Sequence, residues 1–172
     1  MSILSKILAV ITALSTLNAA SAKELADTVK QLPEPTAPAY EEMTAAEFCK
    51  GIDVGWNLGN ALDATGGSGL STETSWGNPK TTKELILAVK DAGFNAVRVP
   101  TTWYKHVSGT NYTIDAKWLD RVQEVVDYAY DEGMYVILNA HHEDFNDPYN
   151  DTCKAASKEL CAIWKQVAER FK

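Results

Sequence analysis

The sequence predicts an α/β fold in which parallel strands alternate with helices. Two segments carry this prediction, because residues 93–100 and 133–142 each run from a glycine through an apolar strand to a polar side chain. Each glycine follows a segment with helical periodicity, and the two glycines stand 40 residues apart. This spacing is typical of repeated β/α units. Functional groups of such proteins lie at the carboxyl ends of the strands, so Arg98 and His141 are the first candidate site residues.

The amino-terminal segment has the pattern of a secretory signal peptide. Lys6 precedes an apolar or small run over residues 7–20, and Ala20-Ser21-Ala22 is an Ala-x-Ala cleavage site. Polar residues interrupt that run, whereas a spanning helix needs ~20 apolar residues. We therefore expect residues 1–22 to be removed and the protein to be secreted and extracellular, without membrane association afterwards. Residues 23–43 contain three prolines and are predicted to form an extended arm.

The remaining elements follow in order along residues 44–172. Thr44 and Glu47 form a capping box that predicts a short helix over 45–50, plugging or edging the domain, with Met43 and Phe48 as its hydrophobic staple. A second capping box at 81–84 and an N-cap at Asp115 predict the starts of two longer helices. Strands are predicted over 55–60, 94–100 and 134–140, a Gly-, Ser- and Thr-rich loop over 61–79, and a last helix over about 155–171. The apolar face of the first long helix is predicted to comprise Leu85, Ala88, Val89 and Ala92.

Composition excludes several classes of function. The formal net charge is −7 and the basic residues are scattered, so we expect no binding to nucleic acid or to an anionic membrane. Cys153 and Cys161 can pair only if Cys153 lies outside the last helix, and Cys49 is expected to be buried. No Cys-x-x-Cys spacing is present, which disfavours a zinc site.

Side-chain alternation along the strands favours a barrel over a doubly wound sheet. If Arg98 faces a barrel interior, then Val97 and Val99 face the helices. If His141 faces inward, Asn139 does too. In a doubly wound sheet Arg98 would lie beneath a helix and would need a buried partner.

Each candidate residue has an alternative structural interpretation. Arg98 can form an ion pair that holds a barrel interior together. Trp76 can form a stacking platform for the face of a sugar, or it can simply pack its loop. His141 and His142 are adjacent and expected to point apart, so a shared metal ion is disfavoured.

Four motifs occur in series and together resemble one family. They are Gly55-Trp56-Asn57-Leu58-Gly59-Asn60, the segment 73–79 with Trp76-Gly77-Asn78-Pro79, the segment 94–100, and Ile137-Leu138-Asn139-Ala140-His141-His142-Glu143. This series resembles the amino-terminal part of glycoside hydrolase family 5, close to its secreted endo-β-1,4-glucanases. The resemblance implies a (β/α)8 TIM barrel of which only about the first three β/α units are present. It also implies retaining hydrolysis of internal β-1,4-glucosidic bonds by two glutamates, without a metal or cofactor, by a monomer acting on a β-glucan polysaccharide.

The resemblance assigns roles to individual residues. Arg98 is similar to the family's active-site arginine, which holds the nucleophile ionised, and His141 to the histidine that lines the subsite at the cleaved bond. His142 and Asn60 match positions that help to bind the glycone, and Trp76 is the candidate stacking residue. The family's acid/base and nucleophile glutamates follow strands four and seven, so both are expected to lie beyond Lys172. Residues 44–172 are then a barrel truncated before strand four, and the fragment is expected to be inactive. The alternatives are a non-catalytic β-glucan-binding module and a small stand-alone α/β protein.

Overall fold

A computed structural model describes residues 44–145 and 152–172, and its sheet contains three parallel strands. These strands are β1 (Gly55–Asn57), β2 (Ala96–Thr101) and β5 (Tyr135–Ala140), and they lie in sequence order. In register, Asn57 is beside Arg98, and Arg98 is beside Ile137. The predicted signal peptide (1–22) and the whole of the predicted proline-containing arm (23–43), including Met43, lie outside the described residues.

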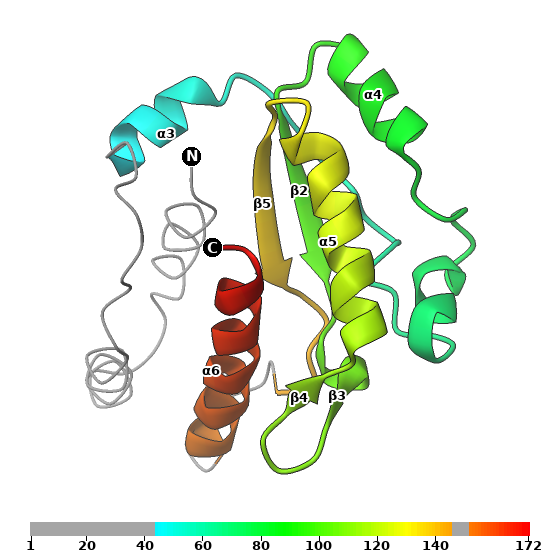
Figure 1. The fold of residues 1–172 in the computed structure, drawn as a ribbon, viewed down its shortest axis with the longest axis vertical. Helices are drawn as coiled ribbons and strands as arrows, with labels where there is room; N and C mark the ends of the chain where they lie inside the picture. Colours follow the sequence, from blue (N-terminus) through cyan, green and yellow to red (C-terminus); the bar gives the residue numbers. More distant parts are fainter. Residues whose placement is uncertain (1–43, 146–151) are drawn as a thin grey trace.

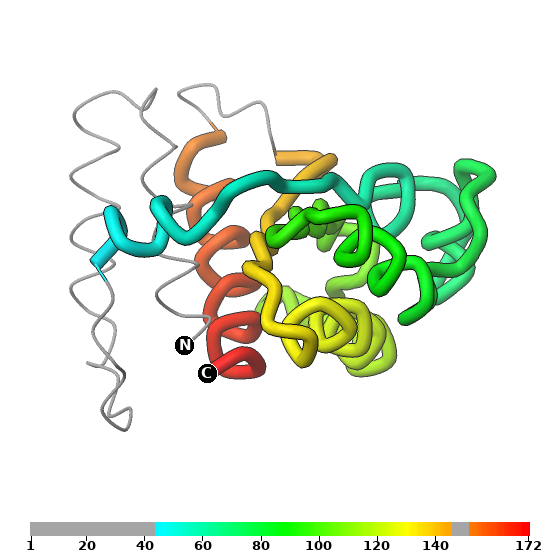
Figure 2. Tube along the Cα trace, turned by 90° about the horizontal axis from the view of Figure 1, so that it is seen from above, coloured from blue at the N-terminus to red at the C-terminus, as the bar shows by residue number. Residues whose placement is uncertain are grey.

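Three helices cover one face of this sheet. They are α4 (Lys83–Asp91), α5 (Ala116–Tyr130) and α6 (Cys153–Arg170). Figures 1 and 2 show α5 and α6 along the same side of β2 and β5, with α4 beside α5. A doubly wound sheet would carry helices on both faces, whereas this arrangement is that of successive β/α units in a barrel. The predicted α/β class with parallel β/α units is therefore confirmed, while closure into a barrel stays a prediction.

The core lies between the sheet and the helices. Val97 and Val99 of β2 are fully buried, as the alternation predicted, and Val136 and Leu138 of β5 point to the same side. The helices contribute a matching apolar layer to this core, namely Trp118, Val122, Val125, Val126, Ile163 and Val167. Each of the aliphatic side chains that is fully buried here stabilises the folded state by roughly 1.5–3 kcal/mol. Polar residues of the strands are consequently left for the opposite face.

Helix α3 (Ala45–Gly51) lies at the amino-terminal edge of the strands, as predicted. The Thr44 side chain accepts from the Glu47 N–H, and the Glu47 carboxylate accepts from Thr44, which confirms the capping box. Phe48 is buried against the edge of the Tyr135 ring, with ring centroids 5.1 Å apart. A side chain at Gly51 would collide with the Tyr135 hydroxyl, so any larger residue there would have to displace the Tyr135 ring.

Two predictions about the first long helix are wrong. Its N-cap is Thr82, whose hydroxyl accepts from the Leu85 N–H, and the Thr81 N–H instead donates to a buried carboxylate of Glu73. Its buried face consists of Ile86 and Val89, whereas Leu85, Ala88 and Ala92 are exposed. Once the helix starts at Lys83, the positions that point to the sheet differ from those chosen by counting apolar residues alone.

Cysteine expectations also need correction. Cys49 is exposed rather than buried, because Phe48 is the residue of α3 that packs into the core and Cys49, the next residue, is turned about 100° away from it. Cys153 is the first residue of α6, and no disulfide joins it to Cys161 in the part of the chain that the structure describes. Placing Cys153 inside the helix removes the condition on which their pairing depended.

Short elements between the predicted ones were missed. A 3-10 helix, η1 (Gly69–Thr74), interrupts the loop 61–79, and η2 (Tyr104–His106) precedes a hairpin of β3 (Val107–Ser108) and β4 (Thr113–Ile114). Strands of two residues leave no readable periodicity. Within the part of the chain that the structure describes, no helix has the length and apolar character needed to cross a membrane.

Candidate functional site

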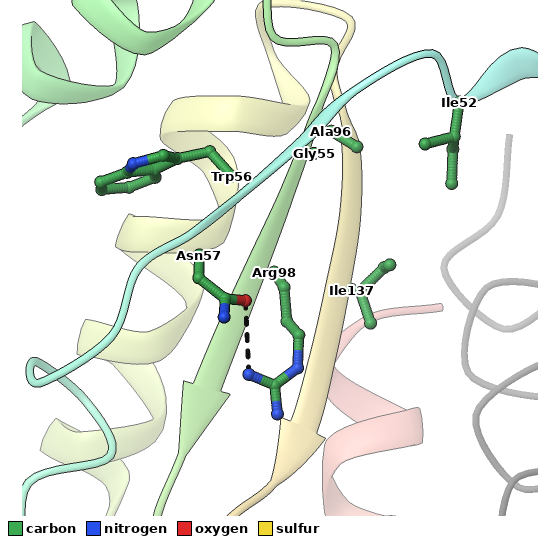
Figure 3. A pocket seen from close by; sticks show the side chains of 7 residues that line it. All are labelled: Ile52, Gly55, Trp56, Asn57, Ala96, Arg98 and Ile137. Atoms are coloured by element: carbon green, nitrogen blue, oxygen red, sulfur yellow. Dashed lines mark hydrogen bonds between the residues drawn. The ribbon is translucent and has the colours of Figure 1, made fainter.

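Arg98 lies on the uncovered face of the sheet, in the middle of a row that crosses all three strands. Figure 3 shows its guanidinium extending beyond Asn57 toward the carboxyl ends, with Nη1 donating to Asn57 Oδ1 at 3.4 Å. The strand β2 continues to Thr101, so Arg98 reaches the strand ends through its length rather than by its backbone position. A pocket of about 360 Å³ opens on this face, and its lining is mostly apolar on the side of Arg98 that faces the amino ends of the strands. It is lined by Ile52, Gly55, Trp56, Asn57, Ala96, Arg98 and Ile137.

His141 follows β5 directly and meets Arg98 across the strand ends. Arg98 Nη2 lies 3.4 Å from His141 Nδ1, and the backbone N–H of His141 donates to the Thr101 carbonyl at 2.9 Å. Burial lowers the pKa of His141, and the neighbouring His142 and Arg98 lower it further, against an opposing effect of Asp63. The lowered pKa favours the neutral imidazole, which can accept as well as donate a hydrogen bond. Arg98 and His141 therefore lie on the same side of the sheet.

His142 lies beside His141 rather than pointing away from it, which corrects the argument that adjacent histidines must diverge. The two ring centroids are 4.3 Å apart. Strand alternation ends at Ala140, and a turn in which the Glu143 N–H donates to the His141 carbonyl at 2.8 Å follows. His142 also contacts Trp76 in an edge-type arrangement, with ring centroids 5.4 Å apart, and Trp76 stays 43% exposed. The indole is thus available to a ligand although it also contacts a neighbouring loop.

Asp63 belongs to this group and was missed by sequence reasoning. Its carboxylate is buried, accepts from the Ala61 N–H at 2.8 Å through Oδ1, and has Oδ2 4.0 Å from His142 Nε2. Nothing in the loop sequence distinguishes Asp63 from a solvated turn residue. Asn60, which was predicted for the site, lies on the same loop in a left-handed conformation with φ 59°. Among the described residues, no hydrogen bond joins Asn60 to Arg98 or to the histidines.

The loop that carries Trp76 is fixed by a buried ion pair. Arg121 of α5 donates to both oxygens of Glu73 at 2.8 Å, and also to the Thr81 carbonyl at 2.6 Å and to Glu124 at 2.6 Å. The first pair is almost completely buried, at 3% and 2% side-chain exposure. The sequence held one signal for it, because Arg121 stands next to Val122 on the helix face that points to the core.

Glu143 is a second buried acid that sequence reasoning did not place. Its two oxygens accept from the N–H groups of Trp103 and Tyr104, each at 2.7 Å, which fixes the loop after β2. Burial raises the pKa of Glu143 to about 7, and Asp144 and Glu159 add to the rise against the two N–H donors. Since both oxygens are engaged by the backbone, Glu143 holds a loop and is not presented to a ligand.

The raised pKa of Glu143 predicts a pH effect on stability. The folded state holds this proton more tightly than the unfolded chain, so the contribution is complete below about pH 4.5 and is lost as pH rises to about 7. The loss amounts to up to about 3 kcal/mol. We expect Glu143→Gln to remove this slope. Urea unfolding of both proteins at several pH values between 4.5 and 7 measures the difference, and parallel curves would contradict it.

His106 makes the free energy of unfolding depend on pH in the opposite direction. Its contribution is the same in the parent and in Glu143→Gln, so it cancels when the two proteins are compared. Its ring stacks on Trp118 with centroids 3.6 Å apart, and burial lowers the pKa of His106 to about 4. This group favours folding at neutral pH and loses that contribution as pH falls from about 6.5 toward 4. Because it is present in both proteins, only the Glu143 contribution remains in their difference.

Together these residues suit a polyhydroxylated ligand. Arg98, Asn57, His141 and His142 offer donors and acceptors at the carboxyl ends of the strands, and Trp76 offers an exposed apolar face. Such a combination binds sugars, whose faces are apolar and whose edges carry hydroxyl groups. Within residues 44–145 and 152–172, no carboxylate forms an ion pair with Arg98.

Comparison with known proteins gives one consistent result. The family model "Cellulase (glycosyl hydrolase family 5)" matches residues 60–172. Endoglucanase A of Ruminococcus albus is 50% identical over 149 residues, which cover 86% of this chain and 41% of that protein. The chain thus spans well under half the length of this relative.

Solved structures that resemble this chain are also endoglucanases. A GH5-4 broad specificity endoglucanase from Ruminococcus champanellensis with bound cellotriose superposes with a TM-score of 0.75 at 44% identity, over 78% of this chain and 41% of that one. A xyloglucan-specific endo-beta-1,4-glucanase from a metagenomic library, in complex with cellotriose, gives a TM-score of 0.64 at 54% identity, over 70% of this chain and 37% of that one.

Proposed function

Because the chain belongs to the cellulase family, glycosyl hydrolase family 5, we propose that it is the amino-terminal part of a longer endoglucanase. That enzyme hydrolyses internal β-1,4-glucosidic bonds of cellulose or a related β-glucan. The observation that carries the proposal is the grouping of Arg98, His141, His142 and Trp76 at the carboxyl edge of a parallel sheet. In barrel enzymes this edge is where substrates bind.

In the proposed mechanism these residues bind and orient the glucan rather than cleave it. Trp76 stacks on a glucose face, while His141, His142 and Asn60 contact hydroxyl groups close to the scissile bond. The retaining reaction needs two carboxyl groups about 5–5.5 Å apart, one as nucleophile and one as acid/base. We assign both to parts of the enzyme outside this chain. Arg98 then contacts the nucleophile and favours its ionised form, as an opposite charge within ~4–6 Å does.

The open pocket beneath Arg98 has a different role in this proposal. Ile52 and Ala96 line its part toward the amino ends of the strands, and Ile137 lies beside Arg98; these are the kinds of side chain that fill a barrel interior. We propose that strands outside this chain cover that apolar part, so that only the end with Arg98 and Asn57 belongs to the substrate site.

The signal pattern of residues 1–22 supports export of the enzyme, which we propose acts outside the cell as a monomer. A barrel of this type typically contains about 250 residues. The mass of the species secreted by the source organism tests this directly. We expect a mature protein of roughly twice the size of this chain or larger. A secreted species of this chain's own size, 18.9 kDa less the signal peptide, would favour a stand-alone domain.

Activity measurements on two proteins test the proposed function. The purified 172-residue chain is expected to release no reducing sugar from carboxymethylcellulose beyond a boiled control, because it lacks the proposed catalytic pair. The longer secreted protein is expected to release it readily. Hydrolysis by the short chain would overturn the assignment of the glutamates. Cellotriose binding without hydrolysis by either protein would favour a glucan-binding module.

A further inference from the structure

Three side chains at the carboxyl edge form a group with the composition of a metal site. Asp63, His141 and His142 each offer one ligand atom, and these atoms all lie within 4.8 Å of one another. We propose that this group binds a divalent transition-metal ion of the Zn²⁺ class. Metal binding is proposed independently of the endoglucanase function, although His141 and His142 are also assigned to glucan binding.

Asp63 gives the first argument, because it is a buried carboxylate with little compensation. Its side chain is 5% exposed, and Oδ1 accepts one hydrogen bond, from the Ala61 N–H. Among the described residues, His142 at 4.0 Å from Oδ2 is its one ion-pair partner, and it is charged only when protonated. Buried carboxylates are paired with cations or coordinate metals. A metal ion between Oδ2 and the imidazoles would supply the missing positive charge.

The surroundings of Asp63 hold it in place for coordination. The Ala61 N–H engages Oδ1 and leaves Oδ2 directed toward His142. The Thr102 hydroxyl donates to the Asp63 carbonyl at 2.9 Å, which fixes the backbone of this loop against the end of β2. Ligating carboxylates in metal sites are typically oriented by such outer hydrogen bonds.

The two histidines complete a three-ligand set. The turn after β5 brings their ring centroids to 4.3 Å, and His142 is exposed enough to adjust its side-chain torsions. Ligand atoms of a tetrahedral Zn²⁺ site lie roughly 3.4 Å apart, as bond lengths near 2.1 Å require. The observed separations need a shift of about 1 Å, which a side-chain rotation provides. Three protein ligands leave a fourth position for water, as in open zinc sites.

Arg98 opposes metal binding and so gives the inference a distinctive test. Its Nη2 lies 3.4 Å from His141 Nδ1. The guanidinium repels a cation bound to that imidazole, and its hydrogen bond competes for a ring nitrogen. Replacing Arg98 by glutamine keeps a polar side chain and removes the charge. We therefore expect Arg98→Gln to bind Zn²⁺ more tightly than the parent chain.

Isothermal titration of the full chain with Zn²⁺, without any glucan, tests the site. The three cysteines are first replaced by serine, because thiolates are strong zinc ligands. The parent should bind one Zn²⁺ saturably and should not bind Mg²⁺, which prefers oxygen ligands. His142→Ala and Asp63→Asn should each weaken binding at least about tenfold, and Arg98→Gln should strengthen it severalfold.

Several results would overturn the site. Absence of saturable Zn²⁺ binding would do so, as would equal affinity in the parent and in His142→Ala. Weaker binding by Arg98→Gln would also contradict it. Far-ultraviolet circular dichroism checks folding of each variant, and if Asp63→Asn does not fold, the exposed His142 decides the result. Glucan hydrolysis enters none of these measurements, so a failure here leaves the proposed endoglucanase function unaffected.

Discussion

Replacing Arg121 by methionine is expected to lower the free energy of unfolding by about 3–5 kcal/mol, because it leaves a buried carboxylate without its partner. Glu73 is 2% exposed, and Arg121 donates to both of its oxygens. Burial alone would raise the pKa of Glu73, yet the hydrogen bonds and charge of Arg121 hold it below its ordinary value. When the arginine is removed, Glu73 must either become protonated or be hydrated by water that enters the core.

The Glu73–Arg121 pair also forms hydrogen bonds with the backbone of Thr81, so removing both charged side chains is not expected to restore full stability. Thr81 is buried, and its N–H donates to Glu73 while its carbonyl accepts from Arg121. A double variant, Glu73→Leu with Arg121→Met, removes both charges and restores apolar volume. Many buried ion pairs can be replaced in this way at little cost. Here we expect a remaining loss of about 1–3 kcal/mol for each Thr81 group left unpaired.

A surface pair provides the matched control. Lys83 lies 3.3 Å from Glu132 but is 47% exposed, so Lys83→Ala should change the unfolding free energy by less than about 1 kcal/mol. Urea unfolding followed by circular dichroism measures all four proteins. A cost for Arg121→Met as small as that of Lys83→Ala would show that the buried pair is not a structural anchor. Full stability of the double variant would show that Thr81 finds other partners.

The position of the pair links this stability to the site. Glu73 is in η1, three residues before Trp76, and Thr81 precedes α4, so the pair holds both ends of the segment that carries the indole. We therefore regard Arg121 as a positioning residue for Trp76. Its loss should release the contact between Trp76 and His142.

The parts of the fold that could be predicted are those with strong periodic patterns. Alternation placed Val97 and Val99 against the helices and Arg98 on the opposite face, because a side chain in a strand has only two directions available. The capping boxes gave mixed results. Thr44 caps α3, but in the segment 81–84 the N-cap is the second threonine, Thr82. The Thr81 N–H donates to Glu73 instead, and no local sequence pattern connects Glu73 to Thr81.

The site was predicted in part for a similar reason. Arg98, His141 and His142 were found because strands place their carboxyl ends together, and Trp76 because of its motif. Asp63 and Glu143 were not placed, since their burial depends on how loops from different β/α units meet. The proximity of the two histidines depends on a turn that begins where the strand periodicity ends.

Replacing Arg98 by lysine in the longer endoglucanase is expected to lower kcat far more than it weakens substrate binding. The substitution keeps the charge but loses the planar fork that can meet a carboxylate with two hydrogen bonds. We expect a barrier increase on the order of 2–4 kcal/mol, the size seen when one charge-stabilising donor is lost. Steady-state kinetics on a soluble β-glucan separates kcat from KM.

The geometry of Arg98 is what makes this prediction specific to catalysis. Both of its contacts within the described residues, to Asn57 and His141, are long at 3.4 Å and involve neutral groups. Neither contact stabilises a partly buried guanidinium as strongly as a carboxylate would. The planar guanidinium is therefore available to the proposed nucleophile. Val97→Ala is the matched control. Val97 is the residue of β2 directly before Arg98, and it is fully buried against the helices. It should lower the melting temperature through lost packing and leave kcat nearly unchanged. If Arg98→Lys instead lowers the melting temperature and preserves kcat, the arginine is structural and the nucleophile is oriented by another group.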